Sequence, residues 1–267
     1  MRAFDYHRPS TLKQAVSLLR KLENAQALAG GQSLIPALKM RLASPAALVD
    51  LGAIEELRGI RLDGGVLTIG AAARHAEVAA AKDAAISIPA LAKLAGGIGD
   101  GQVRNLGTLG GALANNDPAA DYPAAVLGLG ATVNTSKRTI AADRFFTGLY
   151  ETALKPGEII TSVAFPLPRR AAYVKFRQPA SRFAIVGVFV SEGAGSVRVA
   201  VTGAAGCVFR AKAMEKKLVE NFSPDAITKV KMSPEGLNSD IHASAEYRAH
   251  LVTVLAQRAV AAAIAGK

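Results

Sequence analysis

The chain has 267 residues, of which 50% are hydrophobic and 20% are charged. At roughly 100 to 200 residues per domain, this length favours two domains with buried cores and excludes a fibrous or disordered protein. No run of the roughly 20 apolar residues needed to span a bilayer is present. The first residues lack the basic start and apolar run of a secretory signal. We therefore expect a soluble, globular, cytoplasmic protein without a transmembrane segment.

Charge and cysteine content limit the partners. The net charge is +11, and most of it lies after Gly130, which favours phosphate ligands, polyanions or an acidic partner subunit. The basic residues are scattered, tryptophan is absent and aromatic residues are 5%, so we expect no nucleic-acid binding. Cys207 is the only cysteine. It cannot form an internal disulfide or hold an iron–sulfur cluster or a structural zinc ion, so a metal redox centre must belong to another chain.

Periodicity and turn residues predict mixed helices and strands in the first 168 residues. The predicted elements are a helix capped by Ser10, a strand at 26–29, a helix from about Leu34, a strand at 47–50, a hairpin of 58–62 and 66–70, helices near 77 and at 89–94, an apolar helix at 119–127, and strands at 131–133 and 159–165. Residues 96–116 are rich in glycine and have little helical period.

The segment 166–170, Pro-Leu-Pro-Arg-Arg, is the best candidate for a domain boundary. Beyond it, strands are predicted at 173–176, 184–190 and 197–202, and helices at 208–221 and 244–265. Strands followed by helices indicate an α+β domain of about 100 residues.

Common catalytic motifs are missing from the sequence. It contains no Gly-x-Gly-x-x-Gly opening a βαβ unit, no phosphate-binding Gly-x-x-x-x-Gly-Lys-Ser/Thr, no Gly-x-Ser-x-Gly and no His-Glu-x-x-His. His7, His75, His242 and His250 are far apart and lack metal-ligand spacing. We therefore interpret each histidine as structural or exposed.

Two glycine motifs remain as candidate sites. The first is 29–34, Ala-Gly-Gly-Gln-Ser-Leu, and the second is 107–112, Gly-Thr-Leu-Gly-Gly-Ala. Paired glycines before a helix let backbone N–H groups converge on one point, so each motif could hold a phosphate, and Gly31 and Gly110 would allow its close approach. Both motifs could equally be tight turns that need glycine only for their backbone angles.

Three segments, 29–36, 103–111 and 116–121, resemble the FAD-binding medium subunit of molybdenum hydroxylases. The match is nearest to the carbon monoxide dehydrogenase type, which is related to the flavin domain of xanthine dehydrogenase, and it spans nearly the whole chain. The resemblance implies an α+β fold: a two-lobed FAD-binding domain of the vanillyl-alcohol-oxidase kind at 1–168, with lobes at about 1–55 and 56–168, and a smaller α+β domain at 169–267.

The resemblance also implies which residues bind FAD. They are Ala29, Gly30, Gly31, Gln32, Ser33, Leu34, Thr108, Leu109, Gly110, Gly111, Ala112, Asp117, Asp121, Ile160, Lys175 and Phe183. Ala112 departs from one common form of the family, which has asparagine there, and so supplies backbone only. Lys175 could instead be a solvated lysine at a strand edge, and Phe183 an ordinary core aromatic.

By resemblance, the chain is an electron-transfer subunit. It would take electrons from a separate [2Fe–2S] subunit through FAD to an external acceptor, either quinone or NAD, while a molybdopterin subunit hydroxylates the substrate. Carbon monoxide, purines, aldehydes and N-heterocycles remain open as substrates. One alternative is a stand-alone flavin oxidase, for which only His75 could form a histidyl–flavin bond. Another is a non-catalytic nucleotide-binding scaffold.

Overall fold

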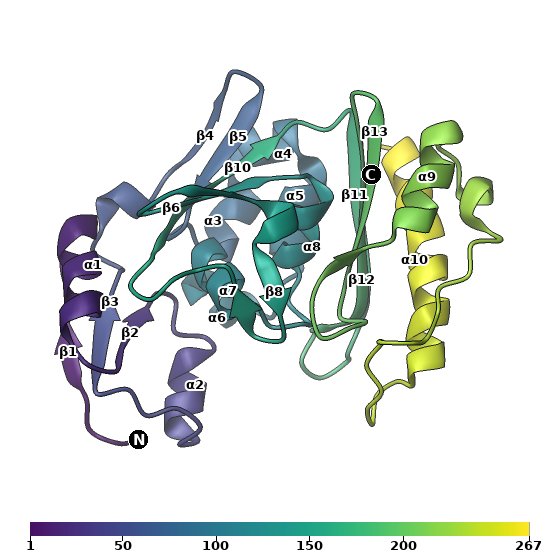
Figure 1. The fold of residues 1–267 in the computed structure, drawn as a ribbon. Helices are drawn as coiled ribbons and strands as arrows, with labels where there is room; N and C mark the ends of the chain where they lie inside the picture. The colour runs from purple at the N-terminus through teal and green to yellow at the C-terminus, as the bar shows by residue number, and fades with distance from the viewer. Residues whose placement is uncertain (267) are drawn as a thin grey trace.

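The structure, a computed structural model, describes residues 1–266 and combines helices with three main β-sheets that follow one another along the chain (Figure 1). The sheets have three, five and four strands, and β8 and β9 form a separate two-stranded ladder. The predicted α+β class is confirmed. No helix in residues 1–266 combines the length and apolar character needed to cross a membrane.

The first sheet is parallel, with strand order β1-β3-β2. Its elements are β1 (Asp5–His7), α1 (Leu12–Lys21), β2 (Ala25–Leu28), α2 (Leu34–Lys39), β3 (Ala47–Asp50) and the short 3₁₀ helix η1 (Glu55–Leu57). Ala15 of α1 packs with Val49 and Ile54 in a small core. The predicted cap of α1 was wrong by one residue: the Thr11 side chain accepts the hydrogen bond from the Gln14 N–H.

The second sheet has strand order β4-β5-β10-β6-β7. Its strands are β4 (Ile60–Asp63), β5 (Val66–Gly70), β6 (Thr132–Thr135), β7 (Thr139–Ala141) and β10 (Ile160–Pro166), and the ladder β8 (Phe146–Gly148) and β9 (Glu151–Thr152) lies between β7 and β10 in the chain, after the 3₁₀ helix η2 (Ala142–Arg144). The predicted hairpin is confirmed, because β4 and β5 pair antiparallel around Gly64 and Gly65.

Six short helices accompany this sheet. They are α3 (His75–Ala80), α4 (Lys82–Ser87), α5 (Pro89–Gly96), α6 (Gly101–Leu106), α7 (Leu109–Asn115) and α8 (Tyr122–Gly128). Residues 96–116, which show little helical period, nevertheless contain α6 and α7, and α4 was not predicted. The apolar helix begins at Tyr122 rather than at 119. Residues 117–120 form a turn instead, in which the Ala120 N–H donates to the Asp117 carbonyl.

The third sheet is antiparallel, with order β11-β12-β13-β14. Its elements are β11 (Arg170–Arg177), β12 (Ala184–Gly193), β13 (Ser196–Thr202), β14 (Phe209–Arg210), α9 (Lys212–Glu220), the 3₁₀ helix η3 (Pro224–Ile227) and α10 (Ala245–Ile264). The helix predicted from 208 therefore begins only at Lys212, after a two-residue strand.

The third sheet is covered on both faces. Helices α9 and α10 pack on the outer face, while α5 and α8 contact the face toward the middle of the molecule (Figure 1). Strand β12 is accordingly buried almost throughout: Val188 lies in the α9–α10 core, and Phe189 lies in the core around α8. A Cβ on Gly128 of α8 would come within 2.7 Å of the Phe189 ring. Glycine there lets the helix and the sheet pack closely.

Candidate functional site

A cavity of about 550 Å³ opens where connecting segments of the three sheets meet. Its walls come from residues 26–34, from 71–75, from parts of 98–122 and 150–160, and from 181–183. Fourteen of the sixteen predicted site residues line it, namely Ala29, Gly30, Gly31, Gln32, Ser33, Leu34, Thr108, Gly110, Gly111, Ala112, Asp117, Asp121, Ile160 and Phe183. The two glycine motifs, which begin 78 residues apart in sequence, therefore border one space.

The first glycine motif presents free backbone donors to this space. Within the described chain, the N–H groups of residues 30 to 34 have no hydrogen-bond acceptor, and the first bond of α2 runs from the Ile35 N–H to the Gly31 carbonyl at 3.0 Å. Gly31 has φ +69°, a left-handed conformation that favours glycine. None of residues 30–34 is buried, and their N–H groups stand at the start of α2, where donors and the helix dipole favour an anion. This run of free donors along a cavity wall is suited to an anionic group such as a phosphate.

Gly30 brings the two motifs into contact. A Cβ at Gly30 would stand 2.2 Å from the Leu106 carbonyl oxygen and 2.6 Å from the Gly107 Cα. Only glycine permits this approach of one loop to the other.

The second motif is built differently. Thr108 is the N-cap of α7 and its hydroxyl accepts from the Gly111 N–H at 3.1 Å. The Leu109 N–H donates to the Ala73 carbonyl and the Gly110 N–H to the Ala71 carbonyl. These three donors are engaged within the protein. That this motif contacts the diphosphate stays a prediction.

Packing explains the glycines of the second motif. A Cβ on Gly110 would lie 2.6 Å from the Ala71 Cβ and 2.9 Å from its carbonyl oxygen. Gly110 thus lets α7 approach the segment that follows β5. Leu109 is fully buried in the core and does not line the cavity, unlike the other predicted residues of this motif.

Asp121 and Lys175 form a buried ion pair at the cavity wall. Lys175 Nζ lies 2.9 Å from Asp121 Oδ2 and also donates to the Gly97 carbonyl at 3.0 Å. The Tyr173 hydroxyl donates to the other carboxylate oxygen. Burial raises the pKa of Asp121, and the Lys175 charge opposes that rise. Lys175 is therefore neither a solvated lysine nor a lining residue: it acts on the cavity through Asp121.

Phe183 lies at the rim of the cavity. Its side chain is 47% exposed, so the alternative of an ordinary core aromatic is wrong. Tyr150, which the sequence did not single out, also lines the cavity; it has φ +55° and its hydroxyl donates to Asp117 at 3.4 Å. No local signal marks Tyr150, because the β8–β9 turn that carries it is placed by tertiary contacts.

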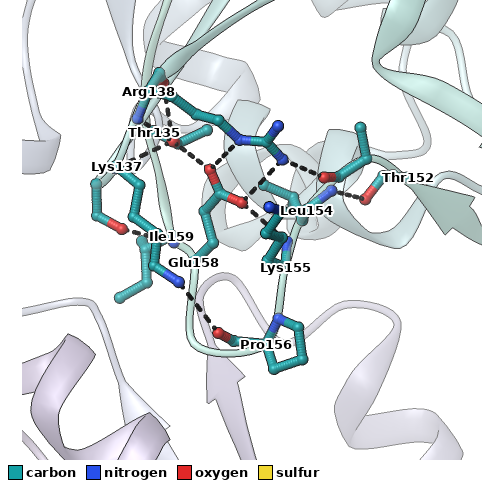
Figure 2. A network of polar contacts seen from close by, with 11 residues as sticks. Thr135, Lys137, Arg138, Thr152, Leu154, Lys155, Pro156, Glu158 and Ile159 are labelled. Atoms are coloured by element: carbon teal, nitrogen blue, oxygen red, sulfur yellow. Dashed lines mark hydrogen bonds and ion pairs between the residues drawn. The ribbon is translucent and has the colours of Figure 1, made fainter.

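Glu158 fixes another wall through the network in Figure 2. Its carboxylate accepts from Arg138 Nε at 3.1 Å, from the Thr135 hydroxyl at 2.6 Å and from the Lys155 N–H at 2.8 Å. Burial opposes ionisation, but the Arg138, Thr135 and Lys155 hydrogen bonds outweigh it and lower the pKa of Glu158 to about 2. The network holds the segment that carries Ile160 into the cavity. No sequence pattern singles out Glu158.

These features fit FAD better than a metal. Among residues 1–266, no group of three or more histidine, cysteine, aspartate or glutamate side chains could hold a metal ion. The free N–H run suits a diphosphate, and the remaining walls are largely apolar, as binding sites for large cofactors usually are. Fold and site together define an α+β FAD-binding protein.

Comparisons with known proteins agree. The family model for the FAD binding domain in molybdopterin dehydrogenase matches residues 2–168. The chain is 36% identical to the carbon monoxide dehydrogenase medium chain of Afipia carboxidovorans, over 97% of this chain and 96% of that one. It is 35% identical to the nicotine 6-hydroxylase medium subunit of Paenarthrobacter nicotinovorans, with the same coverage. The chain belongs to the family of FAD-binding subunits of molybdopterin dehydrogenases.

Solved structures support the same assignment. The carbon monoxide dehydrogenase of Oligotropha carboxidovorans contains a chain that superposes with a TM-score of 0.93 at 35% identity, covering 100% of this chain and 99% of that one. A chain of quinoline 2-oxidoreductase from Pseudomonas putida 86 gives 0.90 at 31% identity, covering 99% and 98%. The predicted family, its α+β fold, the FAD cofactor and the role as an oxidoreductase subunit are confirmed.

Proposed function

We propose that this chain is the electron-transfer subunit of a three-subunit molybdenum hydroxylase. The observation that carries the proposal is the cavity that joins the free N–H groups of residues 30–34 to the rim at Phe183. Relatives named as medium chains of carbon monoxide dehydrogenase and glyceraldehyde dehydrogenase support partner chains of two kinds: a molybdopterin-containing large subunit and a [2Fe–2S] small subunit. Bound FAD would supply the redox chemistry that connects the cluster to quinone or NAD.

Different residues of the chain would contact different parts of FAD. The N–H groups of 30–34 would bind the diphosphate, with the Ser33 hydroxyl as a further donor. Thr108, Gly111 and Ala112 would border the ribityl chain, and Asp117 and Asp121 would accept from its hydroxyl groups. Ile160 would contact one end of the ligand, and Phe183 the ring at the rim. Lys175 would keep Asp121 ionised, since an adjacent cation favours the charged form of a buried carboxyl.

The single cysteine supports a separate cluster subunit, because this polypeptide cannot supply the ligands itself. We also propose that residues 1–168 form the FAD-binding domain and 169–267 the C-terminal domain, and that the complex is cytoplasmic.

Co-expression with the two partner subunits tests the proposal. We expect the three chains to co-purify in low salt, and the flavin absorbance to bleach anaerobically on addition of the substrate of the complex only when the partners are present. Reduction of the lone chain by a small organic substrate would reject the relay and favour a stand-alone oxidase. A chain that binds nucleotide but is never reduced would favour a scaffold.

A further inference from the structure

His75 lies in the cavity wall, where no role has been assigned to it. It is the first residue of α3, and its backbone N–H donates to the Gly107 carbonyl at 3.0 Å. A Cβ on Gly107 would stand 2.5 Å from His75 Nε2, so the imidazole lies directly against the first glycine of the second motif. On another side the ring packs against Tyr122, with centroids 5.3 Å apart.

The two imidazole nitrogens have different surroundings. Nδ1 is buried and has no hydrogen-bond partner within the described chain. Nε2 makes no hydrogen bond there either, yet it is not among the buried atoms without partners, and His75 lines the cavity. Nε2 is therefore the nitrogen that remains open to the cavity.

The burial of Nδ1 determines where the proton sits. A neutral imidazole carries one N–H, and an orphaned buried donor is rarer in proteins than an under-satisfied acceptor. The N–H therefore belongs on Nε2, where a ligand can accept from it. Burial, reinforced by the charge of Arg104, lowers the pKa of His75 to about 4, so the ring is neutral at pH 7. The adjacent Tyr122 hydroxyl is buried and remains protonated, since burial raises its pKa.

We propose that His75 is an FAD-binding residue that donates a hydrogen bond from Nε2–H to an acceptor atom of the cofactor. The inference rests on the proposed FAD cavity and adds to it a neutral donor from α3.

Three substitutions at one position separate binding from packing. His75→Leu removes both nitrogens, His75→Gln places an amide N–H near the position of Nε2, and His75→Asn places one near Nδ1. His7 provides the matched control, because its Nε2 is also buried without a partner in the described chain but His7 does not line the cavity.

The measurement is the Kd for FAD of the purified, flavin-depleted chain, from quenching of flavin fluorescence at pH 7.5. We expect His75→Leu and His75→Asn to raise Kd about tenfold, the effect of losing one hydrogen bond, with His75→Gln and His7→Leu within about twofold of wild type. Equal Kd values for His75→Leu and wild type, or failure of His75→Gln to restore binding, would overturn the inference. A wild-type chain that binds no FAD would instead refute the proposed function.

Nuclear magnetic resonance gives a second readout that does not depend on a variant folding. Long-range ¹H–¹⁵N spectra of the wild-type chain should show the Nε2–H tautomer of His75 and a shift of that nitrogen when FAD is added, while the His7 nitrogens stay unchanged. An Nδ1–H tautomer, or an Nε2 resonance that FAD does not move, would contradict the proposed contact.

Discussion

The two glycine motifs, residues 29–34 and 107–112, border one cavity but use glycine for different physical reasons. In the first, Gly31 has φ +69° and the neighbouring N–H groups have no acceptor in the described chain. In the second, Gly110 lies in a helix, its N–H is bonded to Ala71, and the missing side chain leaves room for that residue. The first motif is available for a ligand, whereas the second mainly holds the fold together beside it.

Among the substitutions that test this difference, Gly110→Val should have the largest effect. Its branched side chain would overlap Ala71, and overpacking of this kind costs about 3 kcal/mol. We expect the free energy of unfolding, measured in urea, to fall by that amount. The fraction of chains that remain folded should bind FAD as the wild type does. Gly101→Ala, where a Cβ meets nothing within 4 Å, should be nearly neutral. A stable Gly110→Val chain without FAD would return the second motif to a phosphate-binding role.

The cavity wall held by the Glu158 ion pair provides a reference for both motifs, and Glu158→Gln tests it. The pKa of Glu158 falls from 4.5 to about 2 on folding, so its ionised form stabilises the protein above pH 4.5, and this stabilisation is lost as the pH falls from 4.5 toward 2. Solvent screens this interaction, because Arg138 is 40% exposed. We therefore expect Glu158→Gln to lower the free energy of unfolding at pH 7 by about 2 kcal/mol.

Urea unfolding of Glu158→Gln and wild type at pH 7 and pH 3 checks this expectation. The difference in the free energy of unfolding between the two proteins should be markedly smaller at pH 3 than at pH 7. Glu55→Gln is the control, since Glu55 pairs with Arg58 while 85% exposed, and such pairs contribute little. A difference that does not depend on pH would show that the shape of the side chain, and not its charge, holds this wall.

Backbone strain and ligand contact can be separated in the first motif by comparing Gly31→Ala with Gly195→Ala. The two glycines have φ +69° and +70°, but only Gly31 lines the cavity. Left-handed alanine costs about 1 kcal/mol at either position, with a further strain at Gly31 from Ile35 Cγ1 at 2.9 Å. We expect FAD to bind roughly tenfold more weakly to Gly31→Ala alone. Similar FAD titrations for the two variants would remove Gly31 from the binding site.

The smallest effects are expected from the hydroxyl groups that precede the two helices. The Thr108 side chain caps α7, and Thr108→Ala should lower stability by about 1 kcal/mol. Ser33 makes no capping hydrogen bond, so Ser33→Ala should leave the unfolding midpoint nearly unchanged and weaken FAD binding a few-fold. If the two variants exchange these effects, the assignment of roles to the two motifs is reversed.

The sequence by itself determined those parts of the molecule that local rules govern. The strand β3 at 47–50, the hairpin turn at Gly64 and Gly65, and the start of α10 after Ser244 follow from hydrophobic pattern, turn residues and capping. The spacing of the two glycine motifs also sufficed for the family, because a rare combination of residues in a fixed order carries more information than either motif alone.

Tertiary structure decided what the pattern could not express. Glycines in 96–116 dilute the helical period. The helix α7 forms because it buries Leu109 and Leu113 and is capped by Thr108, whereas α6 buries no residue and is capped by Asp100. The pairing of Lys175 with Asp121, the exposure of Phe183 at the rim and the clamp on Glu158 each join residues 20 or more positions apart or depend on surface shape. Gly31 and Gly110 cannot be distinguished from the sequence, because glycine has no side chain whose chemistry would indicate its role. The surrounding atoms distinguish them: Gly31 lies in a loop with free N–H donors, and Gly110 lies in a close packing contact with Ala71.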